Sequence, residues 1–442
     1  MTADAAPSAG GRPAPDDPAP NDPGPNGSAA RRPVLVMKFG GTSVANLDRI
    51  RRVAKRVGVE VAGGFDVIVV VSAMAGKTNE LVGWVRETGP FYDAREYDAV
   101  VASGEIVTSG LLSLVLQENG IDARSWQGWQ VPVRTTSAHG SARIAEIPDG
   151  NIRGKFAEGM RVAVVAGFQG ISPEGRVTTL GRGGSDTTAV AFAAAFGAVR
   201  CDIYTDVDGV YTTDPRVASK ARKLDRIAFE EMLELASLGA KVLQTRSVEL
   251  AMRYDVRLRV LSSFEEMGEG AGTLVCPEED IVESNVVSGI AFSRDEAQMT
   301  LIGVQDRPGV SAAIFGPLAE AGVVVDMIVQ NIAEDGRTDM TFSVPVDNVD
   351  RARRAMEGAR GTGALEFAEI VADTEVAKVS VVGIGMRSHA GVAATMFAAL
   401  RDYGVNIKVI TTSEIKISVL IDRKFMELAV QALHDAFGLE RA

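Results

Sequence analysis

Cysteine and histidine are scarce in this chain of 442 residues. The two cysteines are Cys201 and Cys276, and the three histidines are His139, His389 and His434. None of these residues has the spacing of a metal-binding cluster, and two cysteines are too few for a disulfide framework. We therefore expect a protein without disulfides, as is usual in the reducing cytoplasm.

Positive charge is also in deficit, since the formal net charge is −12 and the isoelectric point is about 5.0. This argues against a nucleic acid or an anionic membrane surface as the main partner. The N-terminus lacks the apolar core of a signal peptide, and no apolar run is expected to cross a bilayer. Anionic substrates remain possible, because a local basic site can exist in an acidic protein.

Residues 1–33 have almost nothing to bury and are rich in proline, alanine, glycine and aspartate. This composition is typical of a disordered tail. Hydrophobic residues make up 46% of the whole chain, so the remainder can form substantial cores. A length of 442 residues favours two or three domains.

Strand and helix patterns alternate from residue 34 to about 280. VLVMKFGG and FDVIVVVSAM are continuous apolar runs, as expected for strands covered on both faces. NLDRIRRVAKRVGVEVA shows helical periodicity. The alternation predicts an α/β fold, a three-layer αβα sandwich with a largely parallel central sheet. Ligands should then bind beyond the carboxyl ends of the strands.

An internal repeat follows. Residues 303–328 align with residues 383–410, and five matched positions keep spacings of 6, 3, 4 and 6 in both copies. These pairs are Gly309 and Gly391, Phe315 and Phe397, Leu318 and Leu400, Gly322 and Gly404, and Ile328 and Ile410. The pattern predicts two small βαββαβ modules, at residues 281–370 and 371–442.

Two glycine-rich loops follow predicted strands. In KFGGTS a glycine pair lets backbone N–H groups approach an anion, and Lys38 adds a charge, although an ordinary tight turn fits the same residues. In TLGRGGSDTT, Arg182 can bind a carboxylate or phosphate through two hydrogen bonds. Ser185 or Asp186 can cap the following helix, and Asp186 can instead orient Lys38 or hold a metal-bound water.

A third loop, YTDVDGVYTTDPR, also follows a strand. Asp208 and the glycine after it fit an Asx-type turn, whereas Tyr211, Asp206 and Asp214 fit a nucleotide-binding wall. Elsewhere, Glu105 begins a helix, where it either pairs with the helix dipole or receives a substrate ammonium group. Two glycine loops with separate cations suggest a cleft for two anions, as phosphoryl transfer to a carboxylate requires.

Together, KFGGTSV, VVSAM, ASGE, GFQG, TTLGRGGSDTTAV, IYTDVDGVYTTDPR and FEEMLELASLGAKVLQTRSVE resemble the aspartate kinases of the amino-acid kinase superfamily. The repeat resembles the tandem, ferredoxin-like ACT domains that regulate these enzymes. The likeness spans about residues 34–442 and is greatest to the monofunctional bacterial type sensitive to lysine and threonine. It implies phosphoryl transfer from ATP, with Mg²⁺, to the β-carboxylate of L-aspartate in the cytoplasm. This reaction is the first step toward lysine, threonine, methionine and isoleucine.

The resemblance also assigns roles to residues. Lys38, Arg182 and Asp186 would be catalytic, and aspartate would be held by Ser72, Glu105, Arg182 and Ser185. The residues that would surround ATP are Lys38, Phe39, Gly40, Gly41, Tyr204, Thr205, Val210, Tyr211, Asp214, Pro215 and Lys241. No protein side chain is expected to bind the metal directly.

Effector binding is expected in the repeats. The candidates are Asp306, Gly309, Val325, Asp326, Gln330, Asn406, Ile407 and Ser413. The effectors would be lysine, threonine or both, and the ACT modules would pair in a homo-oligomer or with a shorter regulatory chain. Two alternatives stay open: a kinase acting on glutamate or acetylglutamate, and an amino-acid-binding regulatory subunit without activity.

Overall fold

An eight-stranded sheet forms the centre of the first half of the chain. The computed structural model describes residues 31–238, 242–265, 272–281, 286–332 and 336–441, so most of the expected tail lies outside the described residues. The strand order is β10-β12-β11-β9-β1-β2-β6-β3, and neighbours are parallel except for β11 and β12. The strands are Val34–Phe39 (β1), Asp66–Val71 (β2), Ala123–Trp126 (β3), Val162–Ala166 (β6), Cys201–Thr205 (β9), Arg226–Ala228 (β10), Leu258–Ser262 (β11) and Thr273–Cys276 (β12).

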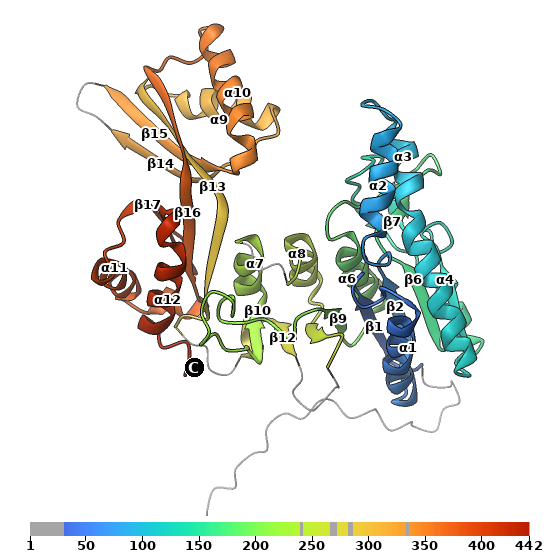
Figure 1. Cartoon of the computed structure of the whole chain (residues 1–442). Helices are drawn as coiled ribbons and strands as arrows, with labels where there is room; N and C mark the ends of the chain where they lie inside the picture. Colours follow the sequence, from blue (N-terminus) through green and yellow to red (C-terminus); the bar gives the residue numbers. More distant parts are fainter. Residues whose placement is uncertain (1–30, 239–241, 266–271, 282–285, 333–335, 442) are drawn as a thin grey trace, which may run out of the picture. The chain divides into compact units, whose positions relative to one another are not determined.

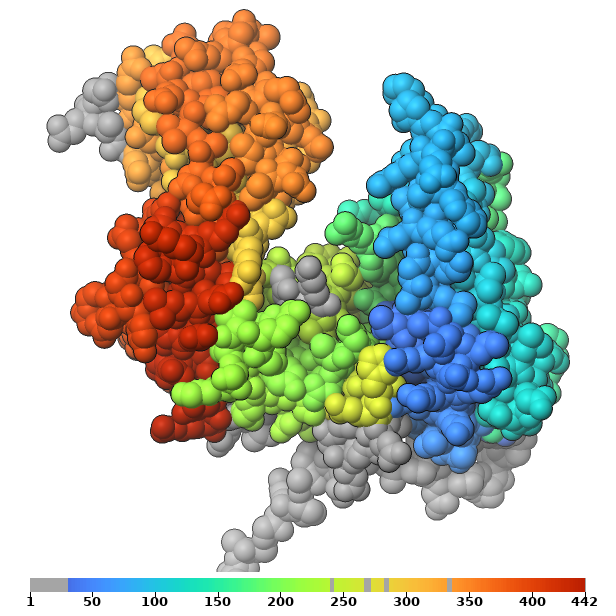
Figure 2. Space-filling view, in the orientation of Figure 1, coloured from blue at the N-terminus to red at the C-terminus, as the bar shows by residue number. Residues whose placement is uncertain are grey.

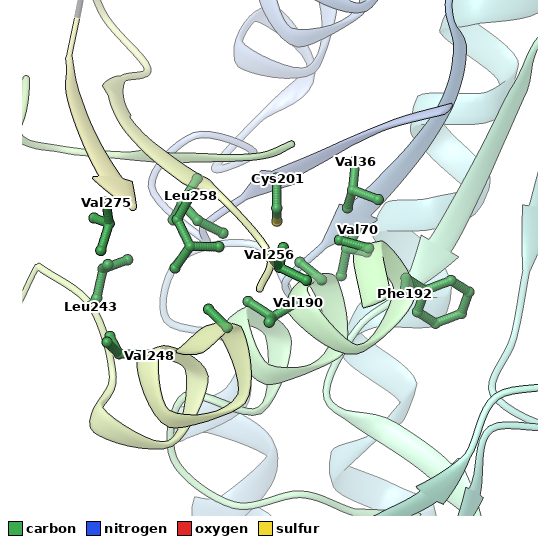
Figure 3. Packing of buried hydrophobic residues seen from close by; sticks show 14 of the residues in the cluster. Val36, Val70, Val190, Phe192, Cys201, Leu243, Val248, Val256, Leu258 and Val275 are labelled. Carbon is green, nitrogen blue, oxygen red and sulfur yellow. The ribbon is translucent and has the colours of Figure 1, made fainter. Parts of the chain in front are cut away.

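Helices cover both faces of this sheet, as the continuous apolar strands predict. Alternate residues of β1 and β2 enter two separate cores, so that Leu35 packs with helices α1 and α4 while Val36 packs with α5, α6 and α8. Figure 3 shows the second of these cores, where Val190 and Phe192 of α6 lie beneath the sheet. The three-layer sandwich is therefore confirmed. The helices are Leu47–Ala62 (α1), Lys77–Glu87 (α2), Ala94–Val101 (α3), Ser103–Glu118 (α4), Gly150–Ala157 (α5), Gly184–Phe196 (α6), Phe229–Ser237 (α7) and Thr245–Tyr254 (α8).

One helical segment contradicts the expectation that no part of the chain is long and apolar enough to cross a bilayer. Residues Ala94–Glu118 meet both criteria by length and composition, although half of their most apolar window is buried in the protein. Helix α4 lies in the sandwich, where Leu112 and Leu116 are fully buried. Its apolar character is thus that of a core helix, and it carries a buried carboxylate, Glu105.

A second, four-stranded sheet was not predicted. Its order is β5-β4-β7-β8, formed by Ile144–Glu146 (β5), Arg134–Thr135 (β4), Gln169–Ile171 (β7) and Val177–Thr179 (β8). These strands contain only two or three residues each, too few for a periodic pattern to be recognised. The sheet matters because β8 leads directly into the loop that contains Arg182.

The repeat forms one continuous six-stranded antiparallel sheet, β14-β15-β13-β16-β18-β17. Strands β13 and β16 run through both modules, as Figure 1 shows, and residue 371 lies within β16. The elements are Gly289–Gln305 (β13), Val310–Glu320 (α9), Asp326–Ile332 (β14), Arg337–Val344 (β15), Val349–Gly361 (α10), Glu369–Val382 (β16), Val392–Asp402 (α11), Ile407–Thr412 (β17), Lys416–Asp422 (β18) and Met426–Ala436 (α12). In the second module, the first part of β13 takes the place of the last strand, where Gly289 pairs with Val382.

The matched glycines of the repeat have matched conformations. Gly309 and Gly391 precede α9 and α11 with φ of 93° and 104°. Gly322 and Gly404 follow these helices with φ of 67° and 68°. Because positive φ favours glycine, the backbone explains why the sequence keeps glycine at these four positions in both copies.

Candidate active site

The two glycine loops meet at one edge of the eight-stranded sheet. Strand β1 pairs in parallel with β2 on one side and with β9 on the other, so the carboxyl ends of all three strands lie together. Gly40 follows β1, Ser72 follows β2, and Asp206 follows β9. The backbone N–H of Ser72 donates to the carbonyl oxygen of Phe39 at 3.1 Å. This edge is the position where open α/β sheets bind ligands.

Lys38 and Asp186 form an ion pair at this edge. The distance from Nζ of Lys38 to Oδ1 of Asp186 is 2.5 Å, and each side chain is only 11% exposed. The lysine is the penultimate residue of β1 and the aspartate lies in the first turn of α6. Among the roles considered for Asp186, this contact fits the one in which its carboxylate orients Lys38.

The first glycine loop lies close to neighbouring backbone. A Cβ atom on Gly41 would be 2.9 Å from the carbonyl oxygen of Ala73, which is closer than real side chains come. The N–H of Gly40 donates to the carbonyl oxygen of Tyr204 at 3.4 Å. Only glycine allows this approach of the β1 loop to Ala73, the second residue after β2.

The second loop needs its glycines for two different reasons. Gly181 and Gly183 have φ of 77° and 68°, the left-handed region that other residues rarely adopt. A Cβ atom on Gly184 would be 2.7 Å from the ring of Phe168. Helix α6 begins at Gly184 with Gly183 as its N-cap, and the cap makes no side-chain hydrogen bond.

The expectation that Ser185 or Asp186 caps α6 is therefore wrong, because both residues lie inside the first turn. Both residues are buried, and their place in the first turn puts them at the positive end of the helix dipole. Ser185 packs against Gly167, where a Cβ atom would be 2.9 Å from its Oγ. Arg182, by contrast, is exposed.

Glu105 is a buried carboxylate with only part of its hydrogen-bonding capacity used. It is 3% exposed, and its Oε1 accepts a hydrogen bond of 3.1 Å from the N–H of Ala73. Its Oε2 is buried and has no hydrogen-bond donor among the described residues. Burial raises the pKa of Glu105 to about 7, and backbone hydrogen bonds offset only part of this effect. An unsatisfied buried carboxylate oxygen is costly, so its retention points to a ligand that donates a hydrogen bond to it.

A buried carboxylate that sequence reasoning missed holds the second glycine loop. Asp98 is fully buried on α3 and accepts hydrogen bonds from Oγ1 of Thr179 at 2.5 Å and from the N–H of Gly140 at 3.0 Å. Its Oδ2 lies 2.7 Å from Nδ1 of His139. A lone aspartate in a helix gives no signal of this role, since only the fold brings residues 98, 139 and 179 together.

The structure does not expose every side chain expected to contact ATP. Tyr204 and Phe39 are fully buried, and their rings stack with centroids 4.5 Å apart. Val210 is also fully buried. None of these three residues presents accessible surface to a nucleotide in this structure.

The rest of the third loop is held by internal contacts. The hydroxyl of Tyr211 donates to Asp208 at 2.9 Å, and Asp214 pairs with Arg216 at 2.6 Å. The side-chain hydrogen bond from Arg216 is the main cause that lowers the pKa of Asp214. The hydroxyl of Thr205 donates to Asp206 at 3.1 Å. Of the remaining expected ATP contacts, Pro215 is exposed, whereas Lys241 lies outside the described residues.

Three of the candidate effector residues border an open pocket in the first ACT-like module. This pocket has a volume of about 430 Å³ and includes Asp306, Gly309 and Gln330. Asp326 is not part of its lining, and its carboxylate instead lies 2.7 Å from Nζ of the buried Lys378. Val325 is partly buried and likewise does not line the pocket.

The second-module candidates lie at the corresponding end of that module. Asn406 is exposed before β17, Ile407 is partly buried at its start, and the N–H of Ser413 donates to the carbonyl oxygen of Lys416 at 2.8 Å. In the alignment of the repeat, Ile407 matches the candidate Val325, whereas Asn406 and Ser413 match Val324 and Asn331.

Among the described residues, no three His, Cys, Asp or Glu side chains come together as a metal cage. Mg²⁺ in phosphoryl transfer is usually held by phosphates and water with one or two carboxylates. The exposed carboxylate of Asp206, next to the end of β9, fits such a limited role. The donor set is thus compatible with a metal that binds together with a nucleotide.

Comparisons with known proteins identify the family of the chain and its domains. Residues 33–262 match the model of the amino acid kinase family, and residues 299–361 and 379–437 each match an ACT domain. The chain is 53% identical to an aspartate kinase of Pseudomonas putida over 92% of this chain and 98% of the relative.

Two solved structures are also similar. Aspartokinase III of E. coli in complex with aspartate and ADP superimposes with a TM-score of 0.74 at 28% identity, covering 91% of this chain and 99% of that one. The same enzyme in complex with lysine and aspartate gives a TM-score of 0.71, with the same identity and coverage. With its kinase domain and its two ACT domains, the chain belongs to the aspartate kinases of the amino acid kinase family.

Proposed function

We propose that aspartate binds between Glu105 and Arg182 and that ATP places its phosphates on the Lys38 loop. The observation that carries the proposal is the buried Oε2 of Glu105, which has no donor among the described residues. A substrate ammonium group would supply the missing hydrogen bonds. Arg182, exposed at the mouth of α6, would bind the α-carboxylate, and Ser72 and Ser185 would hold the substrate between them.

Lys38 would stabilise the transferred phosphoryl group together with the N–H groups of Gly40 and Gly41. Its ion pair with Asp186 fixes the ammonium group at the end of β1 and limits its motion. Preorganised charge of this kind is the main catalytic contribution that a protein makes to phosphoryl transfer. Residues 204–215 would form the wall of the nucleotide site.

In the reaction, an oxygen of the β-carboxylate of aspartate bonds to the γ-phosphorus of ATP. The bond from this phosphorus to the β,γ-bridging oxygen breaks, and ADP leaves with that electron pair. The β-carboxylate is already ionised at pH 7, so no residue has to remove a proton. Mg²⁺, when bound with the nucleotide, would neutralise phosphate charge, with Asp206 as the available carboxylate.

Regulation would follow from effector binding at the ACT domains. Lysine, threonine or both would inhibit, and the pocket that includes Asp306 and Gln330 is the first candidate for an amino-acid effector. The lysine complex of the E. coli enzyme supports lysine as one effector. The product would feed lysine, threonine, methionine and isoleucine synthesis in the cytoplasm, and ACT domains would pair in an oligomer or with a shorter regulatory chain.

The test is an assay of ATP- and Mg²⁺-dependent phosphorylation of L-aspartate, with the acyl phosphate trapped by hydroxylamine. We expect turnover of aspartate but not of L-glutamate, loss of aspartate binding in Arg182→Ala, and inhibition by lysine and threonine added singly or together. Turnover of Arg182→Ala with an unchanged KM for aspartate would contradict the substrate site. Full activity at saturating lysine plus threonine would contradict the proposed regulation.

A further inference from the structure

The nucleotide loop, residues 204–216, rests partly on the second ACT domain. Oγ1 of Thr212 lies 3.0 Å from Nε2 of His434, which is 1% exposed on α12. The carbonyl oxygen of Thr212 accepts a hydrogen bond of 2.7 Å from the N–H of Ile290 in β13. A Cβ atom on Gly289 would be 2.8 Å from the same oxygen, so the strand lies directly against the loop.

The residues just after the loop contact the same helix. Val217 packs into the core of the second ACT domain, and its carbonyl oxygen accepts a hydrogen bond of 2.7 Å from Nε2 of Gln431. Nζ of Lys220 lies 3.1 Å from Asp435 and 3.2 Å from Glu440. Figure 2 shows the red C-terminal segment in contact with the green segment that contains these residues. Packing, hydrogen bonds and charge therefore all join α12 to this stretch of the kinase domain.

The hydroxyl group of Thr212 is oriented from two sides. Its Oγ1 accepts a hydrogen bond of 3.0 Å from the N–H of Arg222, and the N–H of Thr212 donates to the carbonyl oxygen of Arg222 at 2.8 Å. The hydroxyl proton can then be donated to Nε2 of His434 if the imidazole ring is neutral. Burial is the main cause that lowers the pKa of His434, and it outweighs the nearby Asp435 and Glu440. Since Thr212 is 1% exposed, water offers no ready replacement for the ring.

We infer that His434 is a positioning residue for ATP: through Thr212, helix α12 of the second ACT domain fixes the conformation of the nucleotide loop. The inference rests on the proposed nucleotide role of residues 204–215. His434 belongs to the second ACT domain, and it would affect nucleotide affinity through Thr212, without touching the nucleotide. Among the contacts described above, none joins His434 to Glu105 or Arg182, so aspartate affinity should be independent of it.

The experiment compares Thr212→Val, Thr212→Ser, His434→Phe and His434→Gln in the full-length enzyme without effectors. His434→Phe should raise the KM for ATP about fivefold to tenfold, the effect of one buried hydrogen bond. Thr212→Val also removes the hydrogen bond from the N–H of Arg222 and should raise the KM for ATP at least as much. The KM for aspartate should stay within about twofold of the original value. Thr212→Ser and His434→Gln keep a hydrogen-bonding group and should recover most of the ATP affinity. ADP binding by calorimetry should show the same order, and the double variant Thr212→Val/His434→Phe should be no weaker than the worse single variant.

Lys416→Ala is the matched control. Lys416 of β18 pairs with Glu234 of α7 at 2.7 Å, so this variant also removes a contact between the ACT and kinase domains, but away from the nucleotide loop. An equal rise in the KM for ATP in Lys416→Ala, or a parallel rise in the KM for aspartate in Thr212→Val, would overturn the inference.

A further variant, Tyr211→Ala, tests the loop itself. If Tyr211→Ala weakens ATP binding and Thr212→Val does not, the proposed nucleotide site holds and the inference fails. If neither variant changes ATP affinity, the proposed role of the loop fails, and the inference fails with it. His434→Phe can prove unstable, and in that case the isosteric Thr212→Val still decides the question.

Discussion

Nζ of Lys38 and Oδ1 of Asp186 are 2.5 Å apart, and this ion pair joins the end of the central strand β1 to the first turn of helix α6. The two residues are 148 positions apart in the chain and belong to different glycine loops. Because the pair is largely buried, each partner holds the charge of the other in place. The arrangement predicts different consequences for the loss of each residue.

Replacement of Lys38 should abolish most catalysis. Lys38→Met removes the cation proposed to stabilise the transferred phosphoryl group, and kcat should fall about 10²-fold to 10³-fold. It also leaves the carboxylate of Asp186 buried without its partner, so the melting temperature should fall. Steady-state kinetics and thermal unfolding measure both effects. Retention of kcat in a folded Lys38→Met protein would contradict a catalytic role.

The pH dependence of aspartate use should depend on Glu105. Since burial raises its pKa to about 7, the ionised form that accepts an ammonium group is lost as pH falls below about 7. As pH is lowered through the acidic range, kcat/KM for aspartate should decrease, and the decrease should approach about tenfold per pH unit. Glu105→Gln should bind aspartate weakly at every pH and should lack this acidic limb. A wild-type profile that is flat from pH 8 to pH 5.5 would refute this assignment.

The same carboxyl group should cost stability at alkaline pH. Its pKa in the folded state exceeds the ordinary value of 4.5, so stability decreases as pH rises from about 4.5 to about 7 and is then constant. At pH 8, Glu105→Gln should therefore be more stable than wild type by up to about 3 kcal/mol in unfolding free energy. It should accordingly unfold at a higher temperature. Near pH 4.5 the difference should nearly vanish. Calorimetry of both proteins at the two pH values makes the comparison.

Asp98 should stabilise the conformation of the loop that contains Arg182. Asp98→Asn weakens the contacts to Thr179 and His139, and we expect a KM for aspartate raised about tenfold with a KM for ATP changed less than twofold. Asp202→Asn is a suitable control, because Asp202 is also fully buried but pairs with Arg200 and Arg259 in the region of β9 and β11. If both variants lose stability equally but only Asp98→Asn loses aspartate affinity, the role of Asp98 is positional.

Gly183 should tolerate no side chain. Its φ is 68°, and a Cβ atom would lie 2.1 Å from Cγ of Gln244. Gly183→Ala should lower kcat/KM for aspartate and cost on the order of 1–3 kcal/mol in stability. Gln244→Gly in the same chain removes both Cγ and Cβ of residue 244, which would lie 2.1 and 2.5 Å from the new Cβ, and should restore part of both, leaving only the backbone strain. Equal defects in the single and double variants would show that the clash is unimportant.

The sequence predicted the sandwich and the repeat because both depend on long, regular patterns. The continuous apolar runs of β1 and β2 require cover on both faces, and the glycines before α9 and α11 recur at equal spacing. The start of α6 was misplaced because serine and aspartate are stronger N-cap signals than glycine, whereas tertiary packing against Phe168 decided the position.

Other features could not be read from local patterns. Tyr204 looked available to a nucleotide, but the stacking with Phe39 that buries it depends on the pairing of β9 with β1. Asp98 and His434 gave no signal, since their partners are distant in the chain. The role of such polar residues can be recognised only once the fold shows their hydrogen-bond partners.

The sharing of β13 has a consequence for biosynthesis. Ser293, in the first part of this strand, pairs with Lys378, which leaves the ribosome about 85 residues later. At about 5–20 residues per second, this segment of the strand waits several seconds for its partner. The first ACT domain is completed during this interval. The second ACT domain, in contrast, needs the first part of β13 as its last strand, and this segment is synthesised before the first domain. The second domain therefore cannot fold in the order of translation, and the first part of β13 stays without its partner strand until the chain beyond the first ACT domain is made.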